Sequence, residues 1–286
     1  MSSRAPASRQ PAVDARILQR RHEVASADYR HRRRWALSIL ALIALAVGAV
    51  VISRSSLFAI TGVHVEGVPA AQAQLVRDIA GVRPGQNLVA VDLAAAQQRV
   101  AAVPWVQQVR LERKPPSTVV IVVTPRVPLA AVIGGGQTWQ IDADGVVIAP
   151  AGPGRRNHTR RLVRIDAPRA VVPAPGVAVR DRAVRNALQA HSALPAALRA
   201  AAVRYDAPSE PGLRLHLRLR GLRAHGRALD SLPARIWVRL GTAERMDAKS
   251  AVLLELLAQL QREDPEMGIA EINVTAPANP VVVPAR

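Results

Sequence analysis

The feature that most constrains this chain is an uncharged apolar run from Trp35 to Ile52. It consists almost wholly of Leu, Ala, Ile and Val, and its length just suffices for a helix to cross the hydrocarbon core of a bilayer. Polar residues do not recur in it at helical spacing, so every face of the helix could meet lipid. We therefore predict a transmembrane helix over residues 35–53.

Positive charge is distributed unequally on the two sides of this run. Arginines crowd the residues just before it, whereas only Arg54 follows closely. Cationic flanks stay in the cytoplasm, and tryptophan suits the membrane interface. We therefore predict a cytoplasmic N-terminus, an extracytoplasmic C-terminal part, and a membrane flank composed of Arg32, Arg33, Arg34 and Trp35. A cleaved secretory signal is the alternative, but the long N-terminal region and long apolar run favour an anchor.

The composition argues against a nucleic-acid partner despite a net charge of +18. The charge is spread along the whole chain, and almost all of it is Arg, with Lys only at positions 114 and 249. Single-strand binding needs basic stretches interleaved with stacking aromatics, and aromatics make up 2% of the chain. The Arg bias instead suggests a GC-rich, actinobacterial-like genome. Because Cys is absent, disulfides, thiol nucleophiles and Cys-based metal sites are excluded.

The chain on either side of the span differs in character. Residues 1–34 carry few large apolar side chains, and we predict a disordered cytoplasmic tail there. Residues 57–126 show the periodicities of a small α+β module, with Gly81 as a helix stop and Asp92 as an N-cap. The expected order is strand, helix, helix, strand, strand, at Ile60–Val68, Ala70–Ala80, Asp92–Ala102, Val106–Glu112 and Thr118–Thr124. Such a sheet leaves one face for the two helices to cover.

Beyond residue 126 the pattern changes to many short strands, and we predict a β-rich α+β domain over residues 127–276. Helices are expected at Asp181–Leu194 and from Asp247, as N-cap, to Arg262. The expected strands are Ala130–Ile133, Thr138–Ile141, Val146–Ala149, Leu162–Ile165, Ala201–Asp206, Leu213–Leu219, Ala234–Leu240 and Ile269–Thr275. The fold class is therefore α+β throughout.

No residues gather in the sequence as a catalytic site would require. The seven histidines occur singly, without a partner at the i+3 or i+4 spacing that sets two imidazoles on one helical face. Asp142-Ala143-Asp144-Gly145 resembles the start of a calcium loop, but the later ligands are missing, so a hairpin turn explains it better. We therefore predict a binding protein and not an enzyme, with no cofactor, no metal ion and no small-molecule substrate.

The order of these segments resembles the FtsQ/DivIB family of bacterial cell-division proteins. The motifs that carry the resemblance are Leu57-Phe58-Ala59-Ile60, Val63-His64-Val65-Glu66-Gly67, Gly85-Gln86-Asn87-Leu88, Val103-Pro104-Trp105-Val106, Arg113-Lys114-Pro115-Pro116-Ser117-Thr118, Arg126-Val127-Pro128-Leu129-Ala130, Ile141-Asp142-Ala143-Asp144-Gly145-Val146, Val238-Arg239-Leu240-Gly241, Lys249 and Glu271-Ile272-Asn273-Val274. Their order along the chain makes the match specific. Residues 150–176 contain no matching motif.

The resemblance implies a single-pass protein of the cell (inner) membrane at the division septum. Residues 57–126 would be a POTRA domain, and the β domain, residues 127–276, would bind the small bitopic proteins FtsB and FtsL. The implied function is that of a non-enzymatic, essential-type scaffold of the divisome that links cytoplasmic and extracytoplasmic division proteins during septum formation. The lipid bilayer and other divisome members are the remaining expected partners.

Five residues of the first module are expected to be structural. Gly67 and Gly85 suit turn backbone that a Cβ would crowd. Trp105 is expected to pack over the two helices, Pro104 to end the second helix, and Pro116 to shape the following hairpin.

The last predicted strand offers a mechanism for partner binding. Residues 277–286 form a Pro-rich tail, and Pro277, Pro280 and Pro284 forbid further ladder pairing except at an edge. We therefore predict an edge strand to which a partner segment adds by β-augmentation. Its binding residues are Ile269, Glu271, Ile272, Asn273, Val274 and Thr275. The alternative is that this strand is only a member of the sheet.

Two other functions stay open. An anchored cell-wall enzyme would need paired carboxylates or a Ser/Lys pair, which the sequence does not display. A POTRA protein of outer-membrane protein assembly or secretion would need tandem modules and a following barrel.

Overall fold

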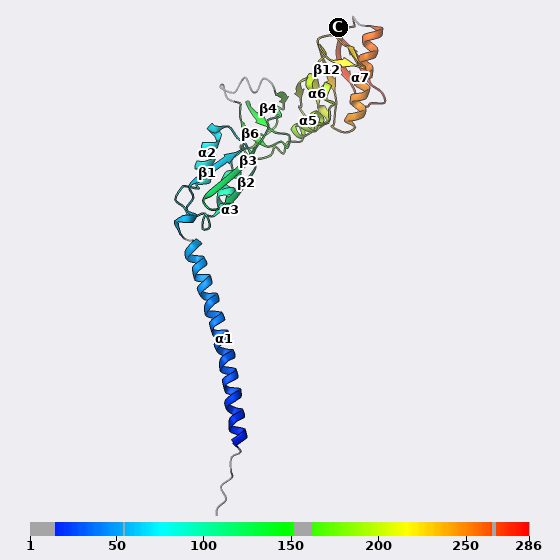
Figure 1. Cartoon of the computed structure of the whole chain (residues 1–286). Coiled ribbons are helices and arrows are strands. Elements are labelled where there is room, and N and C mark those ends of the chain that lie inside the picture. The colour runs from blue at the N-terminus through cyan, green and yellow to red at the C-terminus, as the bar shows by residue number, and fades with distance from the viewer. Residues whose placement is uncertain (1–14, 54, 152–161, 265–266, 286) are drawn as a thin grey trace, which may run out of the picture. The chain divides into compact units, whose positions relative to one another are not determined.

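The protein is described by a computed structural model, which covers residues 15–53, 55–151, 162–264 and 267–285 (Figure 1). Residues 1–14 of the predicted tail lie outside the described residues, as do residues 152–161 of the Arg-rich segment that lacks a family motif.

The chain divides into two compact units. One comprises residues 1–63, 83–91 and 113–119, and the other residues 64–82, 92–112 and 120–286. This division runs through the first α+β module, so the domain limits expected from the sequence stay predictions.

The first element, α1, is one continuous helix from Ala15 to Ser53 (Figure 1). Its segment Arg34–Ile52 has 19 residues, is long and apolar enough to cross a membrane, and is not buried in the protein. An apolar helix whose faces are all exposed fits a lipid environment and a membrane-anchored protein. The predicted disordered tail is wrong from Ala15 onward, because helix-forming Ala, Arg, Gln and Leu extend the helix N-terminally once the span has nucleated it.

The first module follows in the predicted order. After a short 3-10 helix, η1 (Ser56–Phe58), its elements are β1 (Gly62–Glu66), α2 (Ala70–Ala80), α3 (Leu93–Ala101), β2 (Val106–Lys114) and β3 (Thr118–Pro125). They build a three-stranded sheet in the order β1-β3-β2. Val119, Ile121 and Val123 lie on one face of the central strand β3 and are buried, and Val120 on the opposite face is buried as well.

The two helices of this module are bounded by the residues that the sequence indicates. Asp92 accepts a hydrogen bond from the Ala95 N–H at 2.9 Å and so caps α3. Gly81 ends α2 in the left-handed conformation, with φ of 66°. Arg99 of α3 donates to the carbonyl of Ala80 at 2.6 Å, which ties the end of α2 to α3.

Gly67 and Gly85 both have positive φ, 88° and 89°. A Cβ on Gly67 would lie 2.0 Å from the carbonyl oxygen of Val123, so the expected crowding is present there. A Cβ on Gly85 would meet nothing within 4 Å, so at this position the backbone conformation alone favours glycine.

Gly67→Ala and Gly85→Ala therefore form a matched pair. We expect Gly85→Ala to lower the free energy of unfolding by about 1 kcal/mol, the cost of positive φ, and Gly67→Ala by clearly more because it adds a backbone clash. Urea denaturation of the full chain in detergent, followed by tryptophan fluorescence, measures both. Equal losses in the two variants would contradict the close approach of Gly67 to Val123.

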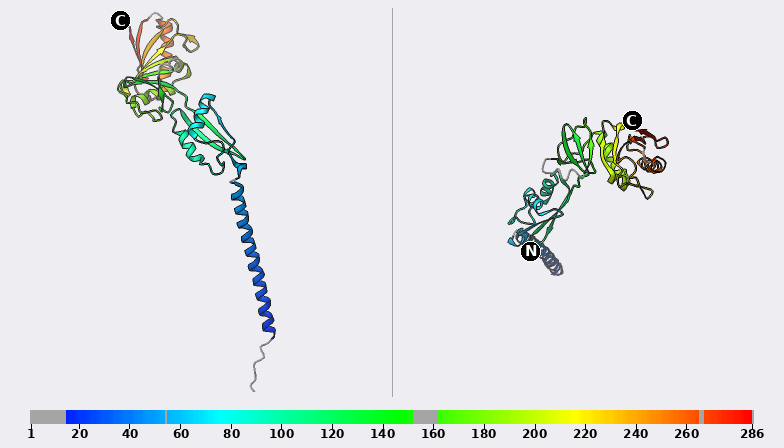
Figure 2. Two further views of the ribbon diagram at one scale, coloured as in Figure 1. Left: turned by 90° about the vertical axis from the view of Figure 1, so that its left-hand side faces the viewer. Right: turned by 90° about the horizontal axis from the view of Figure 1, so that it is seen from above.

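The remaining strands form one nine-stranded sheet in the order β14-β13-β12-β9-β8-β7-β4-β5-β6. In Figure 2 the colour of this domain runs from green at its start to red at its end. Their bounds are β4 Ala130–Gly134, β5 Gln137–Ile141, β6 Val147–Pro150, β7 Val163–Asp166, β8 Ala202–Asp206, β9 Arg214–Arg218, β12 Arg235–Arg239, β13 Ile269–Asn273 and β14 Val281–Pro284. The other elements are α5 Arg182–Ala193, α6 Ala196–Ala201, η3 Glu210–Gly212, the hairpin of β10 Arg223–Ala224 with β11 Arg227–Ala228, and α7 Met246–Glu263. The predicted mixed α+β class is confirmed.

One hydrophobic core holds this β domain together. Alternate strand residues such as Tyr205, Leu215 and Val238 are buried in it with Val184 of α5 and Leu257 of α7. The residues between them on the strands are polar and partly exposed, so one face of the sheet carries the helices and the other faces solvent.

Two buried polar side chains fix elements within this core. His191 of α5 contacts the Tyr205 hydroxyl through Nδ1 at 3.2 Å, and burial, assisted by the charge of Arg199, lowers the pKa of His191 to about 4. Lys249 of α7 donates to the carbonyls of Leu240 and Thr242, both at 2.8 Å. Lys249 is one of the residues that carry the family resemblance, and its role here is to hold the loop after β12 against α7.

The low pKa of His191 makes stability depend on pH. In the unfolded chain this histidine titrates near 6.5 and in the folded chain near 4, so between these values only the unfolded state takes up the proton. We expect the free energy of unfolding to fall as the pH drops from 6.5 to 4, by up to about 3 kcal/mol. Urea denaturation at pH 7 and pH 4.5 tests this, and His191→Gln should show a smaller difference; an unchanged difference would contradict the assignment.

The β6 end of the sheet is covered by a later segment of the chain. Val147 donates to the carbonyl of Val177 at 3.1 Å and accepts from Gly176 at 2.7 Å, and Val146 bridges Ala178. These contacts occupy the backbone groups that an edge strand would leave free.

Two details differ from the sequence predictions in this domain. Helix α7 begins at Met246 after Arg245 in left-handed backbone, so Asp247 lies in the first turn and is not the N-cap. The Pro-rich tail contributes a strand of its own, since Val281–Pro284 forms β14 at the edge of the sheet, where prolines are tolerated.

Candidate partner-binding surface

The predicted binding strand lies one place inside the sheet. β13 pairs in parallel with β12, and on its other side it pairs antiparallel with β14, with Val282 opposite Ile272. The prediction that Ile269–Thr275 is an open edge strand is therefore wrong: β14 is the last strand.

β14 forms next to prolines because of the direction in which its backbone groups point. The N–H of Ala285 donates to the carbonyl of Gly268 at 2.7 Å. Backbone groups alternate in direction along a strand, so odd-numbered residues of this segment face β13 and even-numbered residues face away. Pro280 and Pro284 are even-numbered, and their missing N–H groups cost no bond to β13.

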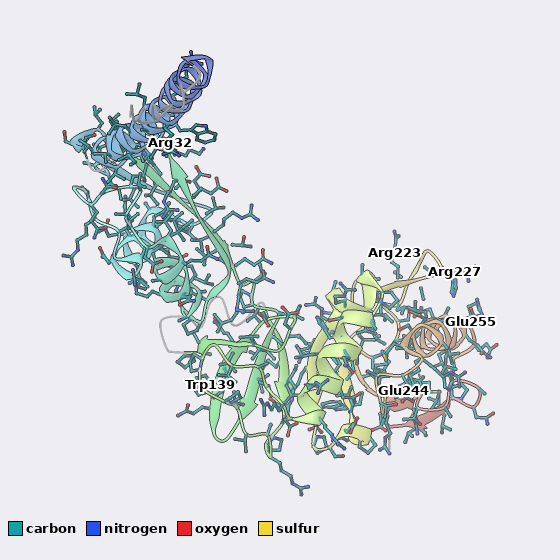
Figure 3. All side chains as sticks on the ribbon, turned by 90° about the horizontal axis from the view of Figure 1, so that it is seen from below. Arg32, Trp139, Arg223, Arg227, Glu244 and Glu255 are labelled. Carbon is teal, nitrogen blue, oxygen red and sulfur yellow. The ribbon has the colours of Figure 1, made fainter. Side chains whose placement is uncertain are left out.

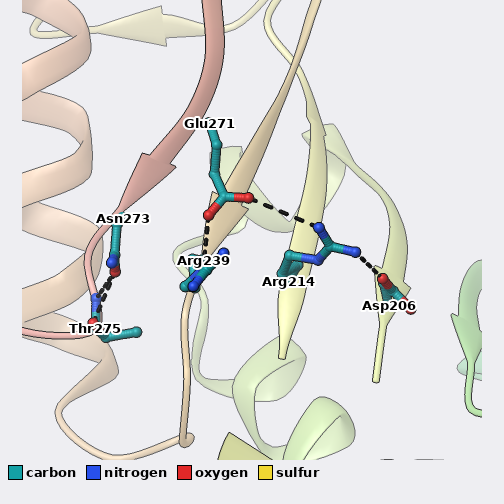
Figure 4. A network of polar contacts seen from close by, with 6 residues as sticks. All are labelled: Asp206, Arg214, Arg239, Glu271, Asn273 and Thr275. Carbon is teal, nitrogen blue, oxygen red and sulfur yellow. Dashed lines mark hydrogen bonds and ion pairs between the residues drawn. The ribbon is translucent and has the colours of Figure 1, made fainter. Parts of the chain in front are cut away.

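The six predicted binding residues divide into two groups. The side chains of Ile269, Ile272 and Val274 are buried in the core. Those of Glu271, Asn273 and Thr275 are less buried, and Asn273 accepts hydrogen bonds from the backbone N–H and hydroxyl of Thr275 at 3.0 and 2.8 Å (Figure 4). A partner can therefore reach the side chains of Ile269, Ile272 and Val274 only if the part of the core around them becomes exposed.

Glu271 is the centre of a polar network across four strands (Figure 4). Its carboxylate accepts from Arg239 of β12 at 2.7 Å and lies 3.9 Å from Arg214 of β9. Arg214 in turn pairs with Asp206 of β8 at 2.5 Å. The network fixes the register of β13 from the exposed face of the sheet.

The same face carries a stacked pair in the middle of the sheet. His216 of β9 stacks on Trp237 of β12 with ring centroids 4.7 Å apart, and Arg214 lies 5.2 Å from the Trp237 ring. Burial, with Arg235 and Arg204 nearby, lowers the pKa of His216. The His216 imidazole therefore stays neutral to a lower pH than the imidazole of a free histidine.

The exposed face is basic. On β7, β8, β9, β12 and β13 six arginines stand against three carboxylates, namely Arg164, Arg204, Arg214, Arg218, Arg235 and Arg239 against Asp166, Asp206 and Glu271. Asp166 pairs with Arg204. The excess of positive charge suits an acidic segment better than a basic one.

The predicted membrane flank lies on α1. Arg32 is exposed (Figure 3). Arg34 is exposed as well, Trp35 is 62% exposed, and only the backbone of Arg33 is described. Exposure of these side chains is compatible with contacts to lipid head groups, which stay a prediction.

Three predicted structural residues of the first module lie at its turns. Pro104 and Trp105 precede β2 and are half-buried, and the Trp105 carbonyl accepts from the N–H of Arg126 at 2.8 Å. Pro116 lies in the turn between β2 and β3. The packing of Trp105 over the helices stays a prediction.

Sequence reasoning missed β14 and the network on the exposed face. The β-branched run Val281 to Val283 was a signal for the strand, which the flanking prolines outweighed. The network had no comparable signal, because Asp206, Arg214 and Glu271 are far apart in sequence.

Removing the carboxylate charge of Glu271 tests how much the polar network contributes to the free energy of unfolding. We expect Glu271→Gln to lower the free energy of unfolding by about 1 kcal/mol, because the arginines of the network are partly exposed and screened. Glu255→Gln is the control, since its pairs with His225 and Arg262 are more exposed. Urea denaturation compares the two, and an equal effect would contradict the role of Glu271.

Comparison with known proteins assigns the first module. Residues 58–126 match the family model "POTRA domain, FtsQ-type". Among described residues in this range the order β1, α2, α3, β2, β3 agrees with the predicted module. Residues 58–126 are therefore a POTRA domain of the FtsQ type, and an apolar helix precedes this domain.

Similarity to named proteins extends beyond this domain. The cell division protein FtsQ of Mycobacteroides abscessus is 31% identical over 223 residues, 77% of this chain and 62% of that protein. FtsQ of Caulobacter vibrioides is 35% identical over 135 residues, 46% of this chain and 44% of that protein. FtsQ of Corynebacterium glutamicum is 32% identical over 117 residues, 36% of this chain and 51% of that protein.

These matches confirm the resemblance to the FtsQ/DivIB family: the chain is similar to proteins named FtsQ. The chain spans less than two thirds of the length of these relatives. A solved structure of the N-terminal domain of Omp85 from Thermosynechococcus elongatus matches 27% of this chain and 34% of that chain at 27% identity, with a TM-score of 0.24.

Proposed function

We propose that this protein is a non-enzymatic scaffold of the bacterial divisome. It is held in the cytoplasmic membrane by the Arg34–Ile52 span, with its N-terminus in the cytoplasm and the β domain outside. The observation that carries the proposal is an FtsQ-type POTRA domain directly after an apolar helix, in a chain whose relatives are named cell division proteins.

The proposed partners are bitopic division proteins of the FtsB and FtsL type. They bind at the β13 end of the large sheet, where Glu271 and Asn273 turn backbone groups away from β12 and toward the outermost strand. The N–H of Val274 supports this assignment, since this even-numbered neighbour donates to Arg239 of β12 at 3.0 Å. The basic exposed face beside β13 favours partners with acidic residues.

The membrane contributes to these contacts. A protein confined to a surface with its partners meets them at a high effective concentration, so modest contacts suffice for assembly. The scaffold therefore needs no large interface of its own.

Localisation tests the proposed role in division. A fluorescent fusion of the full chain is expected at midcell during septation, and depletion of the protein is expected to give filamentous or branched cells. Uniform peripheral fluorescence together with normal division after depletion would contradict the proposal.

The partner site is tested by a backbone change on β13. We expect Asn273→Pro to abolish co-purification of FtsB- and FtsL-type proteins with the tagged full chain, because it removes an N–H that faces the partner. A variant with Arg32 and Arg34 replaced by Ala should retain co-purification. Circular dichroism checks that both variants are folded; a folded Asn273→Pro variant that still captures the partners would place the site elsewhere.

A further inference from the structure

We propose that β14 is a displaceable cover of the partner site, and that a partner strand binds by replacing β14 on β13. The inference rests on the proposed function, whose site it makes specific. The partner is an extended segment that runs antiparallel to β13 and takes the place of residues 281–284.

The outer side of β14 is a poor template for a further strand. Its even-numbered residues face away from β13, and two of the three from position 280 to 284 are Pro280 and Pro284, which have no N–H. Val282 is thus the only backbone donor on that side over these five positions. A partner strand added outside β14 would lack most of the donors of an antiparallel ladder.

The inner side, on β13, is a better template, with regular pairing from Glu271 to Asn273 and one irregularity between Ile269 and Glu271. Glu271 and Asn273 each aim one N–H and one carbonyl toward β14, and Gly268 adds a carbonyl. These groups become available when β14 leaves, and they need no change in the pairing of β13 with β12. A partner segment without prolines could also offer on its far side the donors that β14 lacks.

β14 is short and its side chains are less buried than those of β12 and β13, although its ladder with β13 has four paired positions. It has four residues, and Val281 and Val283 remain 52% and 44% exposed. Only Val282 of this strand packs against the hydrophobic core, beside Ile272. Loss of one half-buried valine and a short ladder is a small cost compared with unfolding of the domain.

The geometry also specifies what the incoming strand must carry. The residue that replaces Val282 faces the core next to Ile272, so it must be apolar and is best β-branched. The residues on either side of it face the exposed, basic side of the sheet and can be polar or acidic. A proline at a position that faces β13 is excluded.

The partner binds only molecules in which β14 has left β13. Its apparent affinity is therefore its intrinsic affinity multiplied by the fraction of such open molecules. If β14 is open in about one molecule in ten, its removal tightens partner binding about tenfold. In return the cover hides the β13 edge from other copies of the chain until a partner arrives.

Opening is tested without any partner by thiol labelling, for which the absence of native cysteine gives a clean background. In Ile272→Cys the thiol lies in the core beside Val282 of β14, whereas in Leu215→Cys it lies in the middle of the sheet; both positions are fully buried. Using a maleimide on the full chain in detergent, we expect labelling of Ile272→Cys at least about tenfold faster than that of Leu215→Cys. Equal rates would mean that β14 leaves only on unfolding, and would overturn the inference.

Replacement is tested by locking the cover. Asn273 and Val281 are paired residues whose Cα atoms lie about 5.5 Å apart in such a ladder, within the range of a disulfide. We expect oxidised Asn273→Cys/Val281→Cys to capture no bitopic partner and the reduced form to recover capture. Each single substitution is the control for the change of side chain.

Deletion of residues 277–286 should give the opposite result, with capture strengthened about tenfold. Capture by the oxidised double variant at the level of the reduced form would overturn the replacement of β14. Absence of capture by the unaltered chain would instead refute the proposed function, whatever the labelling rates are.

Discussion

Burial of alternate strand residues against helices on one face is the constraint on which the rest of the β domain depends. Tyr205, Leu215 and Val238 point into the core, so their neighbours on the strands must point outward. The exposed face is therefore free to carry arginines, carboxylates and the Trp237–His216 stack without disturbing the packing. A shift of one residue in β7, β8, β9, β12 or β13 would bury a charge, so core and exposed face specify the same register.

The sequence predicted most of the fold where a local rule sufficed. The helix Ala70–Ala80 was predicted with the bounds that the structure gives, because an apolar stripe and a stop at Gly81 agree. Asp92 was predicted as an N-cap for the same kind of reason, since the cap depends on a neighbour three residues away. The continuation of α1 before residue 34 was missed, because composition alone does not reveal that a helix can grow out of a nucleated span.

The candidate site was predicted less completely because it depends on pairing between distant segments. β13 was found from its alternation, but its neighbour was not, since the prolines at 280 and 284 were read as breakers for the whole tail. The effect of each proline depends on whether its backbone points toward β13 or away from it. The N–H of Ala285 points toward β13, and both prolines lie an odd number of residues from Ala285, so both point away. The polar network from Asp206 to Glu271 likewise arises only when β8, β9, β12 and β13 lie in one sheet.

The two ends of the nine-stranded sheet are closed in different ways, and this has a consequence for stoichiometry. At β6 the segment of residues 176–179 occupies the edge from within the domain. At β14 the outward side is short of donors because Pro280 and Pro284 face away from β13, so a partner strand binds at this end in place of β14. Before a partner binds, neither end of the sheet is a good template for another copy of the chain. Each copy then has one place on β13 for a partner strand, so the number of anchored copies sets the number of partner strands bound to β13.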